Sequence, residues 1–125
     1  MDVLLIDDDE WLTQIFSFNL NKEGFFARIA RDGIEAIDLI NKKIPDVIVL
    51  DIFMPGPNGI VLMHELQSYA DLSSIPIILC TNSAYGVDIE DLRLYGVVSV
   101  LDKMNMDPLD IVSEVKKLYY EHREN

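Results

Sequence analysis

Two short apolar runs of this chain end in aspartate, and their placement can bring carboxylates together. The run at 3–6 leads into the three aspartates at 7–9, and the run at 47–50 leads into Asp51. Short runs of branched apolar residues bounded by polar ones indicate strands buried on both faces, as in parallel sheets. If the two strands are parallel neighbours, at least three carboxylates meet at one edge of the sheet.

Carboxylates that meet in this way need a counter-charge. Two like charges about 4 Å apart repel by roughly 4 kcal/mol at an effective dielectric constant of about 20, so the cluster is costly unless a cation or protonation relieves it. Asp7, Asp8 and Asp51 offer the oxygen ligands that Mg²⁺ prefers. A carboxylate held against such a metal can attack a phosphoryl group and form an acyl phosphate. The sequence therefore predicts a Mg²⁺ site with phosphoryl-transfer chemistry.

Two further polar residues follow apolar runs and can complete this chemistry. Thr81 follows the run at 77–80, and Lys103 follows the strand pattern at 97–102. Phosphoryl transfer needs positive charge and hydrogen-bond donors around the phosphoryl oxygens. The Lys103 ammonium and the Thr81 hydroxyl can supply these beside the metal.

These residues need a scaffold that places strand ends together. Five strand patterns alternate with five helical patterns: strands at 3–7, 26–30, 46–51, 75–81 and 97–102, and helices at 10–22, 33–42, 58–69, 88–95 and from Asp107 onward. Strict alternation predicts a parallel sheet with helices on both faces. With right-handed crossovers, we expect one flavodoxin-like α/β domain over residues 1–125, with strand order 2-1-3-4-5 and five helices. Asp7 and Asp51 then lie at the switch point, where such folds bind ligands.

Helical spacing of apolar residues predicts which side chains face the core. The predicted stripes hold Trp11, Ile15 and Phe18 on the first helix, with Phe16 as a further candidate, and Ile34, Ile37 and Ile40 on the second. They hold Ile60, Leu62, Met63 and Leu66 on the third helix, and Leu109, Val112, either Val115 or Lys116, and Tyr119 on the last. Asp9 is expected to begin the first helix rather than to bind metal, and Asp107 with Pro108 to begin the last. Cys80 is expected to be a small buried hydrophobic residue.

The composition argues against several classes of protein. The formal net charge is −12, from 10 basic and 22 acidic residues, so nucleic-acid phosphates and anionic membranes should repel the chain. No apolar stretch approaches the roughly 18 residues of a membrane span, and the N-terminus shows no secretory signal pattern. We therefore expect no direct nucleic-acid partner, no membrane insertion and a cytoplasmic location.

Taken together, these residues resemble a response-regulator receiver domain of two-component signal transduction. The resemblance covers essentially the whole chain and rests on Asp7-Asp8, Asp51, Met54-Pro55-Gly56-Pro57-Asn58-Gly59, Thr81, Lys103, Asp32-Gly33-Ile34-Glu35-Ala36 and the approach to Asp51 from Pro45. One such element alone is a weak signal, because acid pairs occur widely. All of them in order on the expected strands make a specific one.

The resemblance implies a role for each residue of the acidic edge. Asp51 would be the phosphoryl acceptor, Asp8 would ligate Mg²⁺ directly, and Asp7 would do so through water. The main-chain carbonyl of Phe53 would complete the protein ligands. Because that contact uses the backbone, the bulky side chain of Phe53 does not exclude it.

The resemblance also implies a switch and partners. Lys103 would pair with the phosphoryl group, and Thr81 would move toward it. A histidine kinase or a phosphotransfer protein would supply the phosphoryl group; the chain itself is not expected to be an enzyme beyond self-catalysed phosphorylation and dephosphorylation. Output would pass to a protein partner, or to a second copy in a homodimer, through the face built from the helix at 88–95, the strand at 97–102 and the last helix.

Three positions depart from the family pattern. Met104 follows Lys103 where receiver domains usually have a proline after a cis bond; a non-proline cis bond costs about 3–4 kcal/mol, against roughly 0.5–1 before proline. We therefore predict a trans bond, or a strained cis bond, and a displaced loop. Val100 replaces the usual aromatic switch residue. Asn82 replaces a small residue, and would either narrow access to Asp51 or donate a hydrogen bond to the phosphoryl group.

These departures keep a second function open, an interaction module with a receiver-like fold that does not switch by phosphorylation. A third class, phosphatases that form an aspartyl phosphate, is unsupported because Phe53 stands two residues beyond Asp51, where those enzymes carry a general acid. A nucleotide-binding flavodoxin-like protein is unsupported because no glycine-rich phosphate loop follows the first strand.

Overall fold

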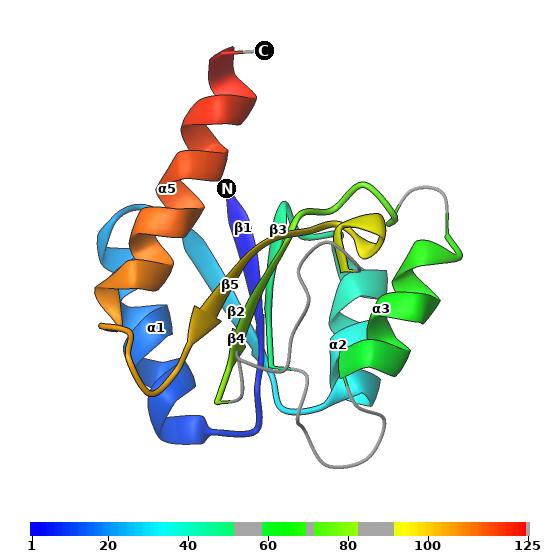
Figure 1. Cartoon of the computed structure of the whole chain (residues 1–125), viewed down its shortest axis with the longest axis horizontal. Helices are drawn as coiled ribbons and strands as arrows, with labels where there is room; N and C mark the ends of the chain where they lie inside the picture. The colour runs from blue at the N-terminus through cyan, green and yellow to red at the C-terminus, as the bar shows by residue number, and fades with distance from the viewer. Residues whose placement is uncertain (52–58, 70–71, 83–91, 125) are drawn as a thin grey trace.

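Five parallel strands form one sheet at the centre of the molecule (Figure 1). A computed structural model of the chain describes residues 1–51, 59–69, 72–82 and 92–124. The strands are β1 (Asp2–Ile6), β2 (Phe26–Ala30), β3 (Val47–Leu50), β4 (Ile77–Thr81) and β5 (Val97–Asp102). Their order is β2-β1-β3-β4-β5, with every neighbouring pair parallel. The predicted flavodoxin-like class and strand order are confirmed.

Helices cover both faces of the sheet. They are α1 (Glu10–Lys22), α2 (Gly33–Lys42), α3 (Gly59–Gln67), the 3-10 turn η2 (Arg93–Tyr95) and α5 (Leu109–Glu124). Helices α1 and α5 lie on one face, and α2 and α3 lie on the other (Figure 1). The described residues thus hold four α-helices rather than the expected five. Of the helix predicted at 88–95, residues 88–91 lie outside them, and the described remainder contains the 3-10 turn η2. In the described part of the chain no helix is long and apolar enough to cross a membrane.

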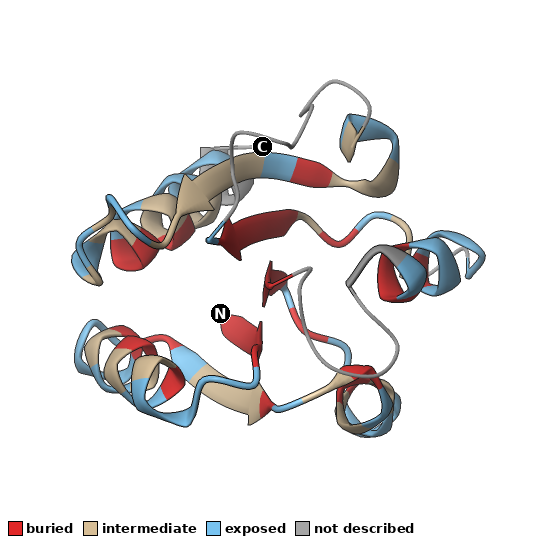
Figure 2. Cartoon of the chain, turned by 60° about the horizontal axis from the view of Figure 1, so that its bottom comes forward, coloured by how far each residue is buried: buried red, intermediate tan, exposed pale blue. Residues whose placement is uncertain are grey.

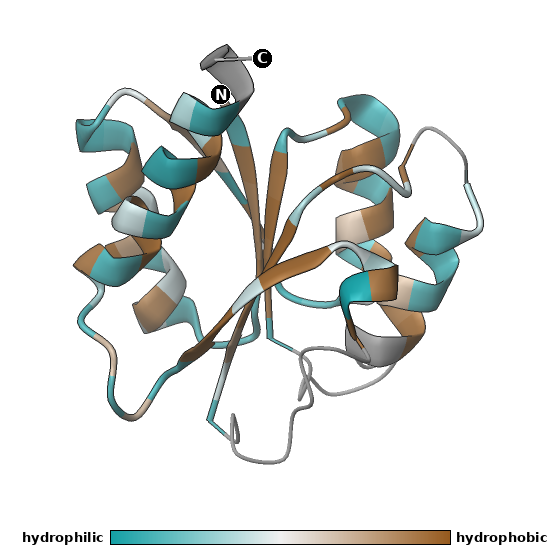
Figure 3. Ribbon diagram, turned by 45° about the horizontal axis from the view of Figure 1, so that its top comes forward, coloured by the Kyte–Doolittle hydropathy of each residue, from teal (hydrophilic) through white to brown (hydrophobic). Residues whose placement is uncertain are grey.

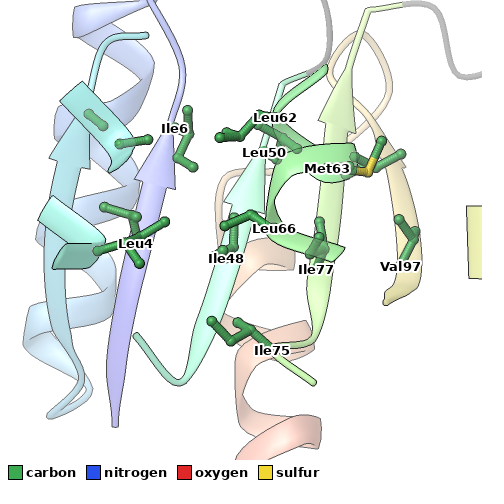
Figure 4. Packing of buried hydrophobic residues seen from close by; sticks show 14 residues of the cluster. Leu4, Ile6, Ile48, Leu50, Leu62, Met63, Leu66, Ile75, Ile77 and Val97 are labelled. Atoms are coloured by element: carbon green, nitrogen blue, oxygen red, sulfur yellow. The ribbon is translucent and has the colours of Figure 1, made fainter. Parts of the chain in front are cut away.

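The three central strands are buried on both faces, as their unbroken apolar runs predict. Figure 2 shows these strands as the most buried part of the fold. Alternate residues of each strand point to opposite faces, so two apolar clusters form. The first cluster, seen in Figure 4, packs α2 and α3 on strand residues that include Leu4, Ile6, Ile48, Leu50 and Ile77. The stripe predicted for the third helix is confirmed at Leu62, Met63 and Leu66.

The second cluster packs α1 and α5 on the other face, and it corrects one prediction. Helix α1 buries Thr13, Phe16 and Leu20, whereas Trp11 and Phe18 are 74% and 67% exposed. Both sides of this helix carry apolar residues, so the prediction is wrong for Trp11 and Phe18 and is confirmed for Phe16. The side with Thr13 can be buried because its hydroxyl donates to carbonyl oxygens of the preceding turn at 3.0 and 3.1 Å.

The first turns of two other helices also differ from the prediction. Ile34 of α2 is 67% exposed and Leu109 of α5 is 55% exposed. The predicted Ile40 and Val112 are buried, and Val115 rather than Lys116 is the buried member of the last stripe. Gly33 and Ala36 in α2 and Ile111 in α5 complete the buried faces. Figure 3 shows these helices apolar toward the sheet and polar on much of their outer surface.

Side-chain caps fix where the helices begin at the carboxyl edge of the sheet. Asp9 accepts from the Leu12 amide at 3.0 Å, and Asp32 accepts from the Glu35 amide at 2.8 Å. Asp107 accepts from the Leu109 amide at 2.9 Å. These contacts satisfy amides that have no partner within the helix. The predicted helix starts at Asp9 and Asp107 are confirmed.

The opposite edge of the sheet holds an ion-pair network. Arg28 of β2 contacts the buried Asp2 of β1 through two nitrogens, each at 3.1 Å. It also donates to the carbonyls of Leu39 and Lys43 at 2.8 and 2.7 Å. Arg28 thereby joins the first two strands to the end of α2.

Candidate functional site

Asp7 and Asp51 meet at the carboxyl edge of the two central strands. Ile6 of β1 pairs with Leu50 of β3, so the next residue of each strand leaves the sheet at the same level. The backbone fixes both residues: the Asp7 amide donates to the Ala30 carbonyl, and the Asp51 amide donates to the Ile6 carbonyl, each at 3.0 Å. Both aspartates are about 95% buried, with 5% and 6% of their surface exposed. The predicted convergence of these carboxylates is confirmed.

Asp8 adds a third carboxylate from the solvent side. One oxygen each of Asp7, Asp8 and Asp51 lies within 4.8 Å of the others, although the Asp8 side chain is exposed. An all-oxygen set with one open side suits a hard cation that keeps several waters, as Mg²⁺ does. Asp7 and Asp51 are buried and carry like charges, so a bound divalent cation would reduce the repulsion between them. The donor set therefore fits Mg²⁺.

Lys103 brings a cation to Asp7 and Asp51. Its ammonium lies 2.5 Å from Asp7 Oδ2 and 3.1 Å from Asp51 Oδ2, and its side chain is 9% exposed. The Lys103 amide donates to the Thr81 carbonyl at 3.0 Å, so the residue follows β5 in register with the end of β4. The sequence prediction that places Lys103 at this edge is confirmed.

The pKa values of Asp7 and Lys103 reflect two opposing effects, burial and the contact between the two side chains. Burial raises the pKa of Asp7 above 3.8, and this outweighs the hydrogen bonds from Lys103 and from the Asp9 amide that lower it. Burial alone would lower the pKa of Lys103, but its contacts with Asp7 and Asp51 outweigh burial and raise that pKa above 10.5. Both shifts favour bound protons. The site therefore favours added positive charge.

Thr81 lies at the same edge, at the end of β4. It is fully buried and pairs in register with Asp102 of β5. The next residue, Asn82, is exposed. The structure thus brings Thr81 to the predicted strand end and places Asn82 just beyond it at the surface.

The loop after Lys103 is held by a residue that the sequence analysis did not single out. Asp102 accepts from the Met104 amide at 2.9 Å and from the Asn105 side-chain amide at 3.0 Å. An aspartate that accepts from the amide two residues later is a common turn device, and this spacing was the available signal. The bond between Lys103 and Met104 is trans, as predicted, and the Met104 side chain is 78% exposed.

Three further sequence predictions concern Val100, Phe53 and Cys80. Val100 is half-buried and packs against the cluster that includes α2 and α3. The predicted metal ligand Phe53, like the rest of 52–58, lies outside the described residues. Cys80, next to Thr81, is buried as predicted, and its thiol lies 3.3 Å from the sulfur of Met106.

Comparison with known proteins identifies the family to which this arrangement belongs. The response regulator receiver domain model matches residues 3–116. A Francisella response regulator 1452 receiver domain is 30% identical, with a TM-score of 0.83 over 97% of this chain and 98% of that one. The receiver domain of a signal transduction histidine kinase from Syntrophus aciditrophicus is 27% identical, with a TM-score of 0.77 over 94% and 88%. The Vibrio cholerae chemotaxis protein CheY4, at 24% identity, has the same fold, with a TM-score of 0.80 over 94% and 97%. The chain belongs to the response regulator receiver domain family.

Proposed function

We propose that this receiver domain accepts a phosphoryl group on Asp51 in a two-component phosphorelay. The observation that carries the proposal is the placement of Asp51, a buried carboxylate 3.1 Å from the Lys103 ammonium and grouped with Asp7 and Asp8 within 4.8 Å. A nucleophile, a cation and further oxygen ligands thus converge at one strand edge. The proposed donor is a phosphohistidine of a histidine kinase or of a phosphotransfer protein.

The transfer is a substitution at phosphorus. A carboxylate oxygen of Asp51 forms a bond to the phosphorus as the bond between phosphorus and the donor imidazole nitrogen breaks. The electron pair of that bond stays on the imidazole, which then takes up a proton. Lys103 offsets charge on the phosphoryl oxygens, and Thr81 brings a hydroxyl at the adjacent strand end. Self-catalysed phosphorylation and dephosphorylation are the full extent of the proposed catalysis.

The proposed cofactor is Mg²⁺, held by Asp7, Asp8 and Asp51. When bound, the ion supplies positive charge that offsets the negative charge of the carboxylates and of the phosphoryl oxygens. Asp8 gives the site its open side, because it is the exposed member of the group. Asp7 is buried, and its Oδ1 accepts a hydrogen bond from the Asp9 amide at 3.0 Å. This contact holds the carboxylate in place.

The proposed output is protein contact at the face that contains η2, β5 and α5. Leu94 and Val98 on this face are 78% and 49% exposed, so apolar surface is available to a partner or to a second copy. Phosphorylation adds nearly two negative charges at the sheet edge that β5 shares. An added charge of this size can shift a two-state equilibrium of the surrounding elements.

A receiver-like interaction module without a phosphorylation switch is the competing function. Val100 favours it, because this half-buried valine cannot swing a ring between buried and exposed positions. The experiment that separates the two is incubation with Mg²⁺ and a small phosphoramidate donor, followed by intact-mass analysis. Phosphorylation predicts a mass gain of one phosphoryl group that Asp51→Asn abolishes. No gain under conditions that label another receiver domain would favour the interaction module.

A further inference from the structure

A groove between α2 and α3 lies on the face of the sheet away from α1 and α5. Two adjoining hollows of about 310 and 230 Å³ form it and share Ile37 and Glu65 as walls. The α2–α3 groove, as we call it, is lined by Ile34, Ile37, Asp38, Ile40 and Ile44 from α2 and the residues after it, and by Val61, Leu62, Glu65, Tyr69 and Leu72 from α3 and the residues after it. The two helices run side by side in Figure 1.

The groove carries more apolar surface than the fold needs. Ile34, Ile44, Val61 and Tyr69 are between 46% and 67% exposed, and all four line it. The core beneath is already closed by Ile40, Leu62 and their neighbours. Apolar side chains scattered singly over a surface need no explanation, but a contiguous apolar strip indicates a binding surface.

Carboxylates on the groove define the charge of what it would bind. Asp38 lines one hollow and Glu65 lines both. Both side chains are exposed, and neither forms an ion pair with another described residue. The chain as a whole carries a net charge of −12. A second copy of the same acidic chain is therefore a poor electrostatic match, and a basic partner is a good one.

We infer that the α2–α3 groove binds an amphipathic helix of a partner protein, with an apolar stripe flanked by lysine or arginine. Helix α2 has ten residues and is about 15 Å long, so the groove accommodates roughly three turns of a partner helix. Anchors at positions i, i+3 or i+4, and i+7 would fill the two hollows in succession. Asp38 and Glu65 would face the basic flanks. The inference is independent of the proposed phosphorylation, because no groove residue belongs to the carboxylate edge.

The test is a titration of ¹⁵N-labelled protein with designed helical peptides of about 15 residues, the length at which an isolated helix begins to be stable. One peptide has a leucine stripe flanked by lysines, the second replaces the lysines with glutamate, and the third keeps the lysines but replaces the leucines with serine. We expect amide shifts centred on α2 and α3 with the first peptide only. Asp51→Asn should bind it as well as the wild type does, which keeps this test separate from that of phosphorylation.

Exposed residues supply matched variants that leave the core intact. Ile34→Ser and Val61→Ser should each weaken binding of the leucine–lysine peptide by about tenfold. Asp38→Lys should weaken it by about threefold and flatten its salt dependence. Phe18→Ser, an equally exposed apolar site on α1, should have no effect. Equal binding of the glutamate peptide, shifts centred on α1 or α5, or self-association through this groove without peptide binding would each overturn the inference.

Discussion

Lys103 lies closer to Asp7 than to Asp51, with its ammonium 2.5 Å from Asp7 Oδ2 and 3.1 Å from Asp51 Oδ2. One buried cation is therefore shared by two buried carboxylates. The lysine neutralises a proposed metal ligand and also contacts the proposed phosphoryl acceptor. The two buried carboxylates and Lys103 thus lack one positive charge before any metal or phosphoryl group is added, and the exposed Asp8 adds a further negative charge.

This shortage predicts that removing one carboxylate stabilises the metal-free protein. Asp51→Asn leaves a one-to-one pair of Asp7 and Lys103, and should raise the free energy of unfolding by about 1 kcal/mol because a like-charge repulsion is removed. Lys103→Met should lower it by about 1–3 kcal/mol, because two buried carboxylates lose a cation that contacts both of them. Urea unfolding with a chelator present measures both. A less stable Asp51→Asn protein would contradict this reading of the site.

Alkaline pH should reduce stability in two steps that different residues cause. Burial raises the pKa of Cys80 to about 12 from 9.0. The folded thiol keeps its proton where the unfolded thiol loses it, so its contribution to stability is complete below pH 9.0 and is lost between pH 9 and about 12. Contacts with carboxylates raise the pKa of Lys103 above 10.5, so its contribution is complete below pH 10.5 and is lost above it, as the pH rises through the folded pKa.

Two variants separate these steps in urea unfolding between pH 8 and 12. Cys80→Ala should remove the loss that begins near pH 9, and Lys103→Met should remove the part that begins above pH 10.5. The slope of stability against pH is the readout, so a uniform change in stability does not affect the result. An unchanged slope in Cys80→Ala would show that the buried thiol does not control the first step.

Two phenylalanines of α1 test which side of this helix faces the core. Phe16 is 2% exposed and Phe18 is 67% exposed. Phe16→Ala should lower the free energy of unfolding by about 3–5 kcal/mol, since it leaves a cavity beneath the helix. Phe18→Ala should change it by less than about 0.5 kcal/mol. Chemical denaturation measures both free energies of unfolding. Similar losses in the two variants would contradict the packing of Phe16, and not Phe18, against the sheet.

Two arginines form a second matched pair. Arg28 contacts the buried Asp2, while Arg31 contacts Glu10 at 2.9 Å with both side chains largely exposed. Arg28→Ala leaves a buried carboxylate with one exposed lysine at 3.2 Å and should cost about 3 kcal/mol or more in unfolding free energy. Arg31→Ala should cost about 0–1 kcal/mol, as exposed pairs do. Thermal unfolding of both proteins at equal salt measures the contrast; equal losses would argue against the role of Arg28 as a joint between β1, β2 and α2.

Strand order and the acidic edge were predictable from the sequence because a few local signals determine them. The apolar runs before Asp7 and Asp51 identify central strands, and parallel pairing then leaves little freedom in where those carboxylates lie. Helix starts at Asp9 and Asp107 were predictable for the same reason, since a cap acts within one turn. Lys103 required only the assumption that the last strand lies beside the fourth.

Burial within the helices was less predictable because it depends on which side packs on the sheet. Helix α1 has apolar residues on two sides, and only the tertiary packing shows that Phe16 and Leu20 are buried while Trp11 and Phe18 are exposed. The short contact between Lys103 and Asp7 was also beyond sequence reasoning. The distance from a lysine to each of two neighbouring carboxylates depends on the side-chain conformations, and the spacing of residues in the sequence does not specify these.

The most direct test of the central claim is phosphoryl transfer to Asp51. The wild type, Asp51→Asn and Asp8→Asn would be incubated with a phosphoramidate donor, with and without Mg²⁺, and their intact masses followed over time. The account predicts a gain of one phosphoryl group in the wild type with Mg²⁺, no gain in Asp51→Asn, and a much slower gain in Asp8→Asn, with a chelator stopping the reaction. A gain of the same size in Asp51→Asn, or one that persists without Mg²⁺, would contradict it.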